Sequence, residues 1–138
     1  MIVLDTNVVL RYLIKDDRAQ AQRATQFLQH HRCLLLPTVL LETVWVMGSK
    51  RGYALERSCV AERLRHIAGL PTVTVEKAHS VSQAIDWYEA GMDFADALHL
   101  ALADHRGFAT FDQDVGRFVD DHNLPFPGSK GVRSLLML

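Results

Sequence analysis

The feature that most constrains the fold of this chain is the alternation of short apolar runs with longer segments of helical periodicity. Short apolar runs bounded by turn residues are typical of buried strands, and apolar residues spaced three or four positions apart are typical of helices. Repeated strand and helix units form helical layers around a mostly parallel sheet. We therefore predict an α/β fold with strands at residues 2–5, 33–36, 72–75 and 108–110, and a weak fifth strand near 124–126.

Segments of helical periodicity fill the intervals between these strands. We predict helices at residues 7–14, 17–31, 38–50, 55–68, 76–90, 93–105 and 114–119. Asp17 and Thr38 are the expected N-caps of two of them, because Asp and Thr side chains accept hydrogen bonds from the free N–H groups of a first helical turn.

The bulk properties indicate one folded domain. A length of 138 residues favours a single domain over residues 1–138, with residues 128–138 as a less ordered tail. An apolar content of 49% and a charged content of 22% are those of a folded chain rather than a disordered one. Cys33 and Cys59 are too few for a disulfide framework and are expected to be free thiols.

Targeting signals and net charge give only default expectations. The first residues lack the basic region of a secretory signal, and no apolar stretch has the length of a membrane helix, so we expect a cytoplasmic protein with no membrane partner. A net charge of −1 supplies no global attraction to nucleic acid, so RNA binding needs a local basic patch. The candidates are Arg11 with Lys15 and Lys50 with Arg51, which are equally interpretable as ordinary helix ends.

Four acidic residues occupy positions that are unusual for surface carboxylates. Asp5 closes an apolar run, Glu42 interrupts another, and Asp96 lies between Ala95 and Ala97. Asp112 follows the fourth predicted strand, with Asp114 just behind it. Removing a carboxylate from water costs several kcal/mol unless it is paired, protonated or bound to a cation. A shared metal ion is the simplest single explanation for the set.

The predicted topology brings these acids toward one crevice. In open parallel sheets the binding crevice lies beyond the carboxyl ends of the strands. Asp5 ends the first strand, Glu42 lies one turn into the helix after the second, and Asp112 follows the fourth. Asp96 lies near the start of the helix that leads to the fourth strand. Because carboxylate oxygens are the ligands that hard cations prefer, the predicted ion is Mg²⁺ or Mn²⁺, with His99 in a supporting or core position.

Each acid also has a purely structural interpretation. Asp5 with Thr6 can cap the first helix, and Asp93 with Asp96 can form a capping box. Either Asp112 or Asp114 can cap the short helix that follows. Glu42 fits such an account least, because apolar residues surround it on nearly every face of its helix. Both interpretations remain open at the level of sequence.

Four segments of the chain resemble the PIN-domain ribonucleases, and in particular the VapC-type toxins of toxin-antitoxin pairs. The segments are Leu4-Asp5-Thr6-Asn7-Val8, Leu41-Glu42, Asp93-Phe94-Ala95-Asp96-Ala97-Leu98-His99 and Ala109-Thr110-Phe111-Asp112-Gln113-Asp114. No one segment is specific, but their order and spacing span nearly the whole chain.

The resemblance implies a fold, an activity and a set of site residues. The implied fold is a three-layer α/β sandwich with a central, mostly parallel sheet of four to five strands. The implied protein is a Mg²⁺- or Mn²⁺-dependent endoribonuclease that forms a homodimer and is blocked by a small antitoxin protein. Matched residue by residue, the acidic quartet is Asp5, Glu42, Asp96 and Asp112, with Asp114 as a substitute for Asp112; the supporting positions are Thr6, Asn7, Asp93, His99 and Thr110.

These residues predict a catalytic mechanism, and two alternative functions remain open. In the predicted mechanism Asp5 and Asp96 bind the metal, while Glu42 and Asp112 complete the charge and orient the attacking water. A phosphatase-like phosphotransfer domain also places Asp at strand ends, but here the first strand ends in Asp-Thr-Asn rather than Asp-x-Asp. A catalytically weak PIN-like scaffold is expected to have lost some of the acids, and this chain retains all four.

Overall fold

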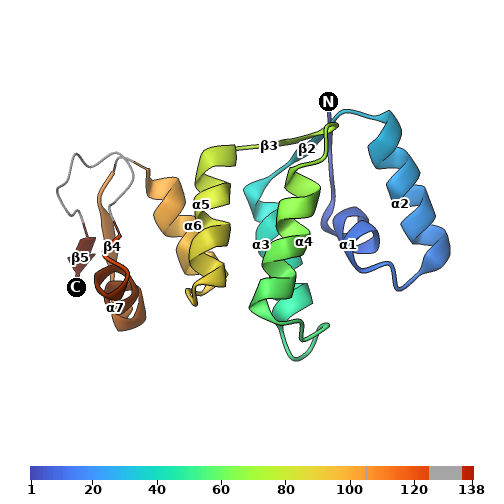
Figure 1. Cartoon of the computed structure of the whole chain (residues 1–138). Helices are drawn as coiled ribbons and strands as arrows, with labels where there is room; N and C mark the ends of the chain where they lie inside the picture. The colour runs from blue at the N-terminus through green and yellow to red at the C-terminus, as the bar shows by residue number, and fades with distance from the viewer. Residues whose placement is uncertain (105, 125–134) are drawn as a thin grey trace.

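The structure is a computed structural model that describes residues 1–104, 106–124 and 135–138. In chain order the elements are β1 (Ile2–Val3), α1 (Thr6–Ile14), α2 (Arg18–His30), β2 (Cys33–Leu35), α3 (Pro37–Gly48), α4 (Arg57–Ala68), β3 (Val73–Val75), α5 (Ala78–Glu89), α6 (Phe94–Ala103), β4 (Phe108–Thr110), α7 (Gln113–Asp121) and β5 (Leu135–Met137). Figure 1 shows this arrangement from end to end. The α/β class predicted from the sequence is confirmed.

The described strands are parallel but form two separate sheets. One sheet has the order β1-β2-β3, with Ile2 beside Cys33 and Cys33 beside Val73. The other pairs β4 with β5, with Phe108 beside Leu135. The predicted central sheet of four to five strands is therefore divided, and Figure 1 shows β4, α7 and β5 at one end of the molecule and β1 toward the other.

The predicted elements match the described ones closely. Every helix boundary agrees within two residues, and β4 covers the predicted residues 108–110. The weak strand expected near 124–126 is not seen at Leu124, and residues 125 and 126 lie outside the described part of the chain. The last strand lies instead at Leu135–Met137, inside the stretch expected to be a less ordered tail; residues 128–134 of that stretch are not described.

The two expected helix caps had different outcomes. Asp17 caps α2, and its carboxylate accepts a hydrogen bond of 3.0 Å from the Gln20 N–H. Thr38 does not cap α3, because that helix begins one residue earlier at Pro37, with Leu36 in the cap position. Proline suits a first helical position since its missing N–H would have no partner there.

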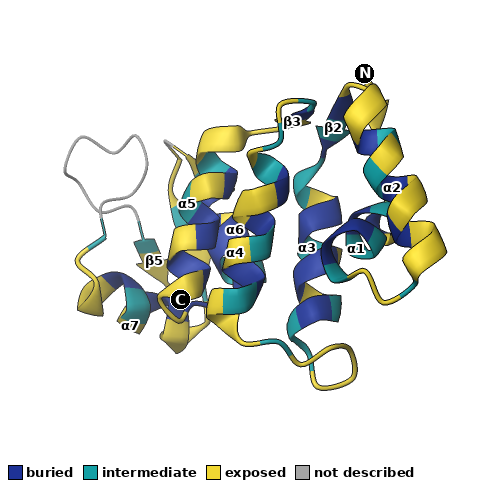
Figure 2. Ribbon diagram, turned by 45° about the vertical axis from the view of Figure 1, so that its right-hand side comes forward, coloured by how far each residue is buried: buried dark blue, intermediate teal, exposed yellow. Residues whose placement is uncertain are grey.

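A continuous apolar core lies between the helices. Leu40 and Met47 of α3, Leu64 and Ile67 of α4, and Leu100 of α6 are almost completely buried. Figure 2 shows the buried residues along the facing sides of these helices. Helices α5 and α6 pack against each other, and α3 contacts both α1 and α6. The core therefore fixes the start of α6 relative to α3.

Two further expectations concern cysteines and membranes. Both cysteines are free thiols, with Cys33 buried and Cys59 half-buried, as predicted. Among the described residues, no helix combines the length and the apolarity that crossing a membrane requires.

Candidate active site

Asp5 follows β1 and begins α1. Its carboxylate is exposed and accepts a hydrogen bond of 2.8 Å from the Thr6 N–H, which makes it the N-cap of the helix. The Thr6 hydroxyl beside it is buried and has no hydrogen-bond partner within the described residues. Asn7 is exposed on the first turn. The end of β1 thus presents one carboxylate, one exposed amide and one unpaired hydroxyl.

Asp93 and Asp96 lie at the start of α6. Asp93 is exposed and caps the helix by accepting a hydrogen bond of 3.2 Å from the Asp96 N–H. Asp96 lies within the first turn and is half-buried. The next two residues, Ala97 and Leu98, are buried in the core, which leaves Asp96 at the edge of the buried face of α6.

Asp112 follows β4 and begins α7. Its N–H donates to the Thr110 hydroxyl at 2.9 Å, and its carboxylate accepts from the Asp114 N–H at 2.9 Å, so Asp112 is the N-cap of α7. Asp114 forms an ion pair with Arg117 on the same helix. The Thr110 hydroxyl therefore holds the Asp112 backbone in place, whereas the Asp114 carboxylate is already paired with the Arg117 guanidinium.

The Asp96 and Asp112 carboxyl groups meet across the gap between α6 and β4. Burial raises the pKa of Asp96 above its ordinary value, and the negative charges of Asp93 and Asp112 raise it further. A side-chain hydrogen bond with Asp112 acts in the same direction, while His99 opposes it. The structure thus brings together Asp93, Asp96 and Asp112, with exposed His99 nearby.

Asp5 and Glu42 are not part of this cluster in a single chain. Neither is among the charges that shift the pKa of Asp96. Glu42 is exposed, on the side of α3 that also carries exposed Thr38 and Trp45, although its sequence setting favours a carboxylate turned away from solvent. Most of the apolar residues that surround it in sequence are turned into the core, and Trp45 is the exposed exception. Within the described residues, no three His, Cys, Asp or Glu side chains are arranged to hold a metal ion.

The donor chemistry nevertheless fits a hard divalent cation. Every acid of the predicted set supplies carboxylate oxygen, and the repulsion felt by Asp96 is the kind that a bound cation relieves. The structure groups Asp93, Asp96 and Asp112, and neither Asp5 nor Glu42 is among the charges that act on Asp96.

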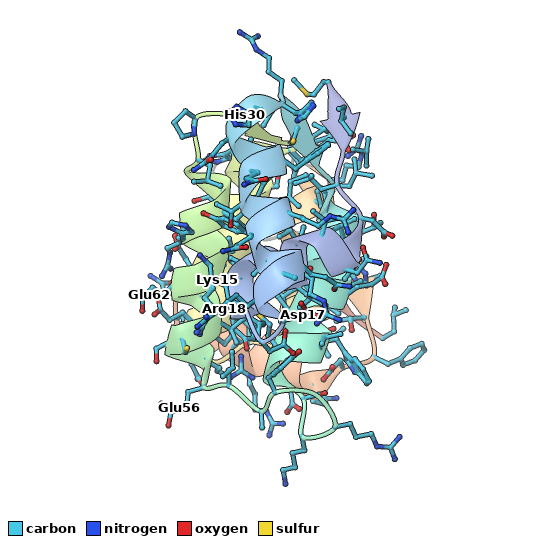
Figure 3. All side chains as sticks on the ribbon, turned by 90° about the vertical axis from the view of Figure 1, so that its right-hand side faces the viewer. Lys15, Asp17, Arg18, His30, Glu56 and Glu62 are labelled. Carbon is cyan, nitrogen blue, oxygen red and sulfur yellow. The ribbon has the colours of Figure 1, made fainter. Side chains whose placement is uncertain are left out.

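The predicted RNA-contacting residues lie away from this cluster. Arg11 is ion-paired with Asp16 at 3.0 Å, and Lys15 lies over the Tyr12 ring. Figure 3 shows Lys15, Asp17 and Arg18 near one end of α2, with His30 at the other end. Lys50 and Arg51 are exposed in the loop between α3 and α4.

Sequence reasoning missed Arg57, which holds the turn that leads into α6. Its guanidinium donates to the backbone carbonyls of Tyr88 at 2.8 Å and Met92 at 2.7 Å, and it stacks over the Tyr88 ring. These contacts tie α4 to the end of α5 and so position Asp93. The sequence carries no signal for them, because the carbonyls lie 31 and 35 residues away.

Comparison with known proteins supplies one finding. Neither the search of curated proteins nor the search of solved structures gave a match. The family described as PIN domain matches residues 2–120, which include every acid of the predicted site. The chain therefore belongs to the PIN-domain family.

Proposed function

We propose that this protein is a metal-dependent endoribonuclease that cleaves single-stranded RNA or RNA loops. PIN domains are nuclease-type domains and generally use divalent metal ions. The observation that best supports the proposal is the convergence of Asp93, Asp96 and Asp112, because acids held together at a cost in repulsion are a common mark of a functional site.

The proposed roles are those that the sequence resemblance assigns to the acids. Asp5 and Asp96 would hold Mg²⁺ or Mn²⁺, while Glu42 and Asp112 would complete the negative charge and orient the attacking water. A bound divalent ion there supplies Lewis acidity toward the phosphate and makes a coordinated water more acidic. Thr110 fixes the Asp112 backbone, and Asp93 fixes the first turn of α6 that carries Asp96.

The proposed substrate class follows from charge and shape. Acids repel phosphate, so RNA approaches only where a cation neutralises them. A base-paired A-form helix presents stacked bases and a rigid backbone, whereas a single strand or loop can bend its scissile phosphate into a crevice. Exposed Trp45 lies on the Glu42 side of α3 and offers a stacking surface for an unpaired base.

As a biological role we propose the toxin of a toxin-antitoxin pair. The sequence resemblance to VapC-type toxins supports this assignment, and it brings with it a homodimer and a small antitoxin protein that covers the acids. Co-expression with the protein encoded by the neighbouring reading frame tests this role directly. Growth arrest on expression alone and rescue on co-expression are the expected results.

One observation favours a second candidate, a catalytically weak scaffold. Asp5, Asp93 and Asp112 each cap a helix, so all three have structural roles that need no metal. Asparagine caps helices about as well as aspartate, so an Asp-to-Asn change removes the charge and keeps the cap. This property separates the two candidates.

The test compares charge-removing variants with a matched control. Asp5→Asn and Asp96→Asn should lower the rate of Mg²⁺-dependent RNA cleavage at least about a hundredfold with the fold retained. Asp86→Asn, which removes an exposed acid of α5 that is ion-paired with Arg65 and is not among the charges acting on Asp96, should leave the rate unchanged. Cleavage at the wild-type rate by purified Asp5→Asn and Asp96→Asn would contradict the roles assigned to these acids, whereas the absence of Mg²⁺-dependent cleavage by the wild type itself would favour the scaffold.

A further inference from the structure

We propose that a pocket beside the acid cluster binds one guanine base of the RNA and so gives cleavage a sequence preference. The pocket lies between the second half of α3 and the start of α6. Trp45 stacks on the base, the Asp93 carboxylate accepts from its N–H groups, and the Arg57 guanidinium donates to its carbonyl oxygen. The preference in cleavage rests on the proposed nuclease function, whereas binding of the base alone does not.

The pocket is a cavity of about 290 Å³ with mostly apolar walls. Its principal lining residues are Leu41, Trp45, Arg57, Tyr88, Asp93 and Phe94. Apolar and aromatic walls that carry a few convergent polar groups are typical of sites for small organic molecules. Such sites measure roughly 300–1,000 Å³, so a cavity at the lower end of this range suits a single planar base.

The floor of the pocket is held by packed side chains. The rings of Tyr88 and Phe94 are buried and meet edge to face, with their centroids 5.7 Å apart. The Arg57 guanidinium carbon lies 4.6 Å from the centroid of the Tyr88 ring. Figure 1 shows the α3–α4 loop and the α5–α6 turn at the same end of the molecule, and α3 contacts α6. Walls that are already in place reduce the entropy lost when a ligand binds.

Trp45 supplies an aromatic surface at this pocket. It has 62% of its surface accessible, whereas Trp87 is buried in the core. Stacking on aromatic side chains is a main source of affinity for unpaired bases, and it tolerates every base because every base has a π-face. The choice of base must therefore come from the polar groups of the pocket.

Those polar groups are one acceptor and one donor with unused capacity. Asp93 Oδ2 accepts from the Asp96 N–H at 3.2 Å, and Oδ1 has no hydrogen-bond partner among the described residues. Arg57 donates from Nη1 to the carbonyls of Tyr88 and Met92, which leaves three of its five N–H groups for a ligand. In the described ranges, Arg57 and Asp93 form no ion pair with each other.

Guanine is the base that matches this pair best. Its Watson–Crick edge presents the N1–H and N2–H donors side by side, with the O6 acceptor next to them. A carboxylate accepts both N–H groups, and an arginine donates to O6. Adenine has an acceptor at N1, which faces the carboxylate lone pairs, and hypoxanthine lacks only the 2-amino group. Cytosine and uracil each offer a single N–H direction at this edge.

The pocket and the acid cluster share Asp93. Its charge raises the pKa of Asp96, and its side chain also lines the pocket. Trp45 lies three residues after exposed Glu42, so the two share one face of α3. Because base and phosphate belong to one nucleotide, a guanine held here brings a phosphate to the neighbourhood of Asp96 and Asp112. The pocket thus selects RNA cleavage next to a guanine.

The first test measures binding of uncharged nucleosides by NMR of ¹⁵N-labelled protein, and it needs neither a metal ion nor cleavage. The two tryptophans give two indole N–H signals. Guanosine should shift the Trp45 signal, identified by its absence from Trp45→Phe, and leave the Trp87 signal in place. Affinity should fall from guanosine to inosine to adenosine. No shift of the Trp45 signal, or equal affinities for the three nucleosides, would overturn the proposal.

The second test compares cleavage of unstructured RNAs that carry guanine, hypoxanthine or adenine at one position. The wild type should cleave beside guanine roughly tenfold faster than beside adenine, with hypoxanthine between them. The ratio of rates within one protein cancels general effects on the fold or on metal binding. Equal cleavage of the three RNAs would overturn the preference.

Asp93→Asn and Asp17→Asn form a matched pair for this ratio. Both residues cap a helix, and asparagine keeps the cap in each case. Asp93→Asn replaces a carboxylate oxygen by an amide donor and should bring the guanine-to-adenine ratio near one. Asp17 does not line the pocket, so Asp17→Asn should keep the wild-type ratio. An unchanged ratio in Asp93→Asn would overturn the assigned role.

The two tests separate this proposal from the proposed function. If guanosine shifts the Trp45 signal but the wild type fails to cleave RNA in Mg²⁺, the base pocket stands and the nuclease function fails. If the wild type cleaves all three RNAs equally and guanosine causes no shift, the nuclease function stands and the base pocket fails.

Discussion

At the scale of single residues, Asp96 is the acid of the candidate site whose pKa the fold raises. The folded protein raises its pKa through burial and through the charges of Asp93 and Asp112. The folded state therefore favours the protonated form, and the resulting stabilisation is complete below the unfolded pKa of about 4 and is lost as the pH rises through the folded pKa. At neutral pH the ionised Asp96 costs stability, which a chain tolerates where the charge has a use.

This linkage predicts that Asp96→Asn is more stable than the wild type at pH 7, with a higher thermal midpoint. The gain should shrink as the pH falls toward about 4, because protonation then removes the same charge from the wild type. Differential scanning calorimetry across this pH range measures it. Asp86→Asn is the matched control, since it removes only an exposed ion pair. A midpoint difference that does not depend on pH would contradict the assigned cause.

Sequence alone identified the acids but not their environments. Of the four acids expected to converge, Asp96 and Asp112 interact, joined by Asp93, and the capping roles of Asp5, Asp93 and Asp112 match the structural interpretation. Glu42 differs because the direction of its side chain depends on which face of α3 meets α1 and α6. That choice is made by tertiary packing, and a helix with apolar residues on nearly every side does not specify it.

At the scale of elements, Arg57 is the link between the helical scaffold and the site. Its guanidinium donates to the carbonyl of Tyr88 at the end of α5, which also accepts from the Gly91 N–H, and to the carbonyl of Met92 in the turn before α6. We predict that Arg57→Ala lowers the free energy of unfolding by about 1.5–3 kcal/mol, because hydrogen bonds to a charged donor are lost. Urea denaturation measures this change.

The same variant should also loosen the start of α6. Amide exchange at residues 93–96 should accelerate, and RNA cleavage should fall, because Asp93 and Asp96 lose their fixed position. Arg65→Ala is the control on the same helix, since its ion pairs with Asp86 and Glu89 are exposed and contribute less than about 1 kcal/mol. Equal effects of the two substitutions would show that Arg57 has no special role in positioning.

The secondary structure was predictable because each element has a local signal. Apolar periodicity, Asp17 at an N-cap and short apolar runs determine the seven helices and the first four strands to within two residues, whereas the last strand lies at Leu135–Met137 rather than near residues 124–126. The partition of the strands was not predictable in this way. Strand pairing depends on which edges meet in space, and the apolar patterns of β1 and β4 are equally suited to a partner in the same chain or in another.

At the scale of the whole molecule, the exposed apolar edges predict self-association. Phe111→Asp places a charge on the open edge of β4 and should reduce any self-association through that edge, because a charged edge residue opposes strand addition. Trp45→Asp changes another large, exposed aromatic residue, on α3, and should leave self-association unchanged. Light scattering during gel filtration gives the mass of each. A Phe111→Asp protein with the wild-type mass would argue against the β4 edge as the contact.

The central claim is that the carboxylates of this PIN domain act on RNA through a divalent ion. The most direct measurement is the rate of cleavage of a loop-containing RNA by the wild-type protein, first in excess EDTA and then with Mg²⁺ or Mn²⁺ added back. The account predicts no cleavage above background in EDTA and full recovery with either ion. Cleavage at an unchanged rate in EDTA would contradict it.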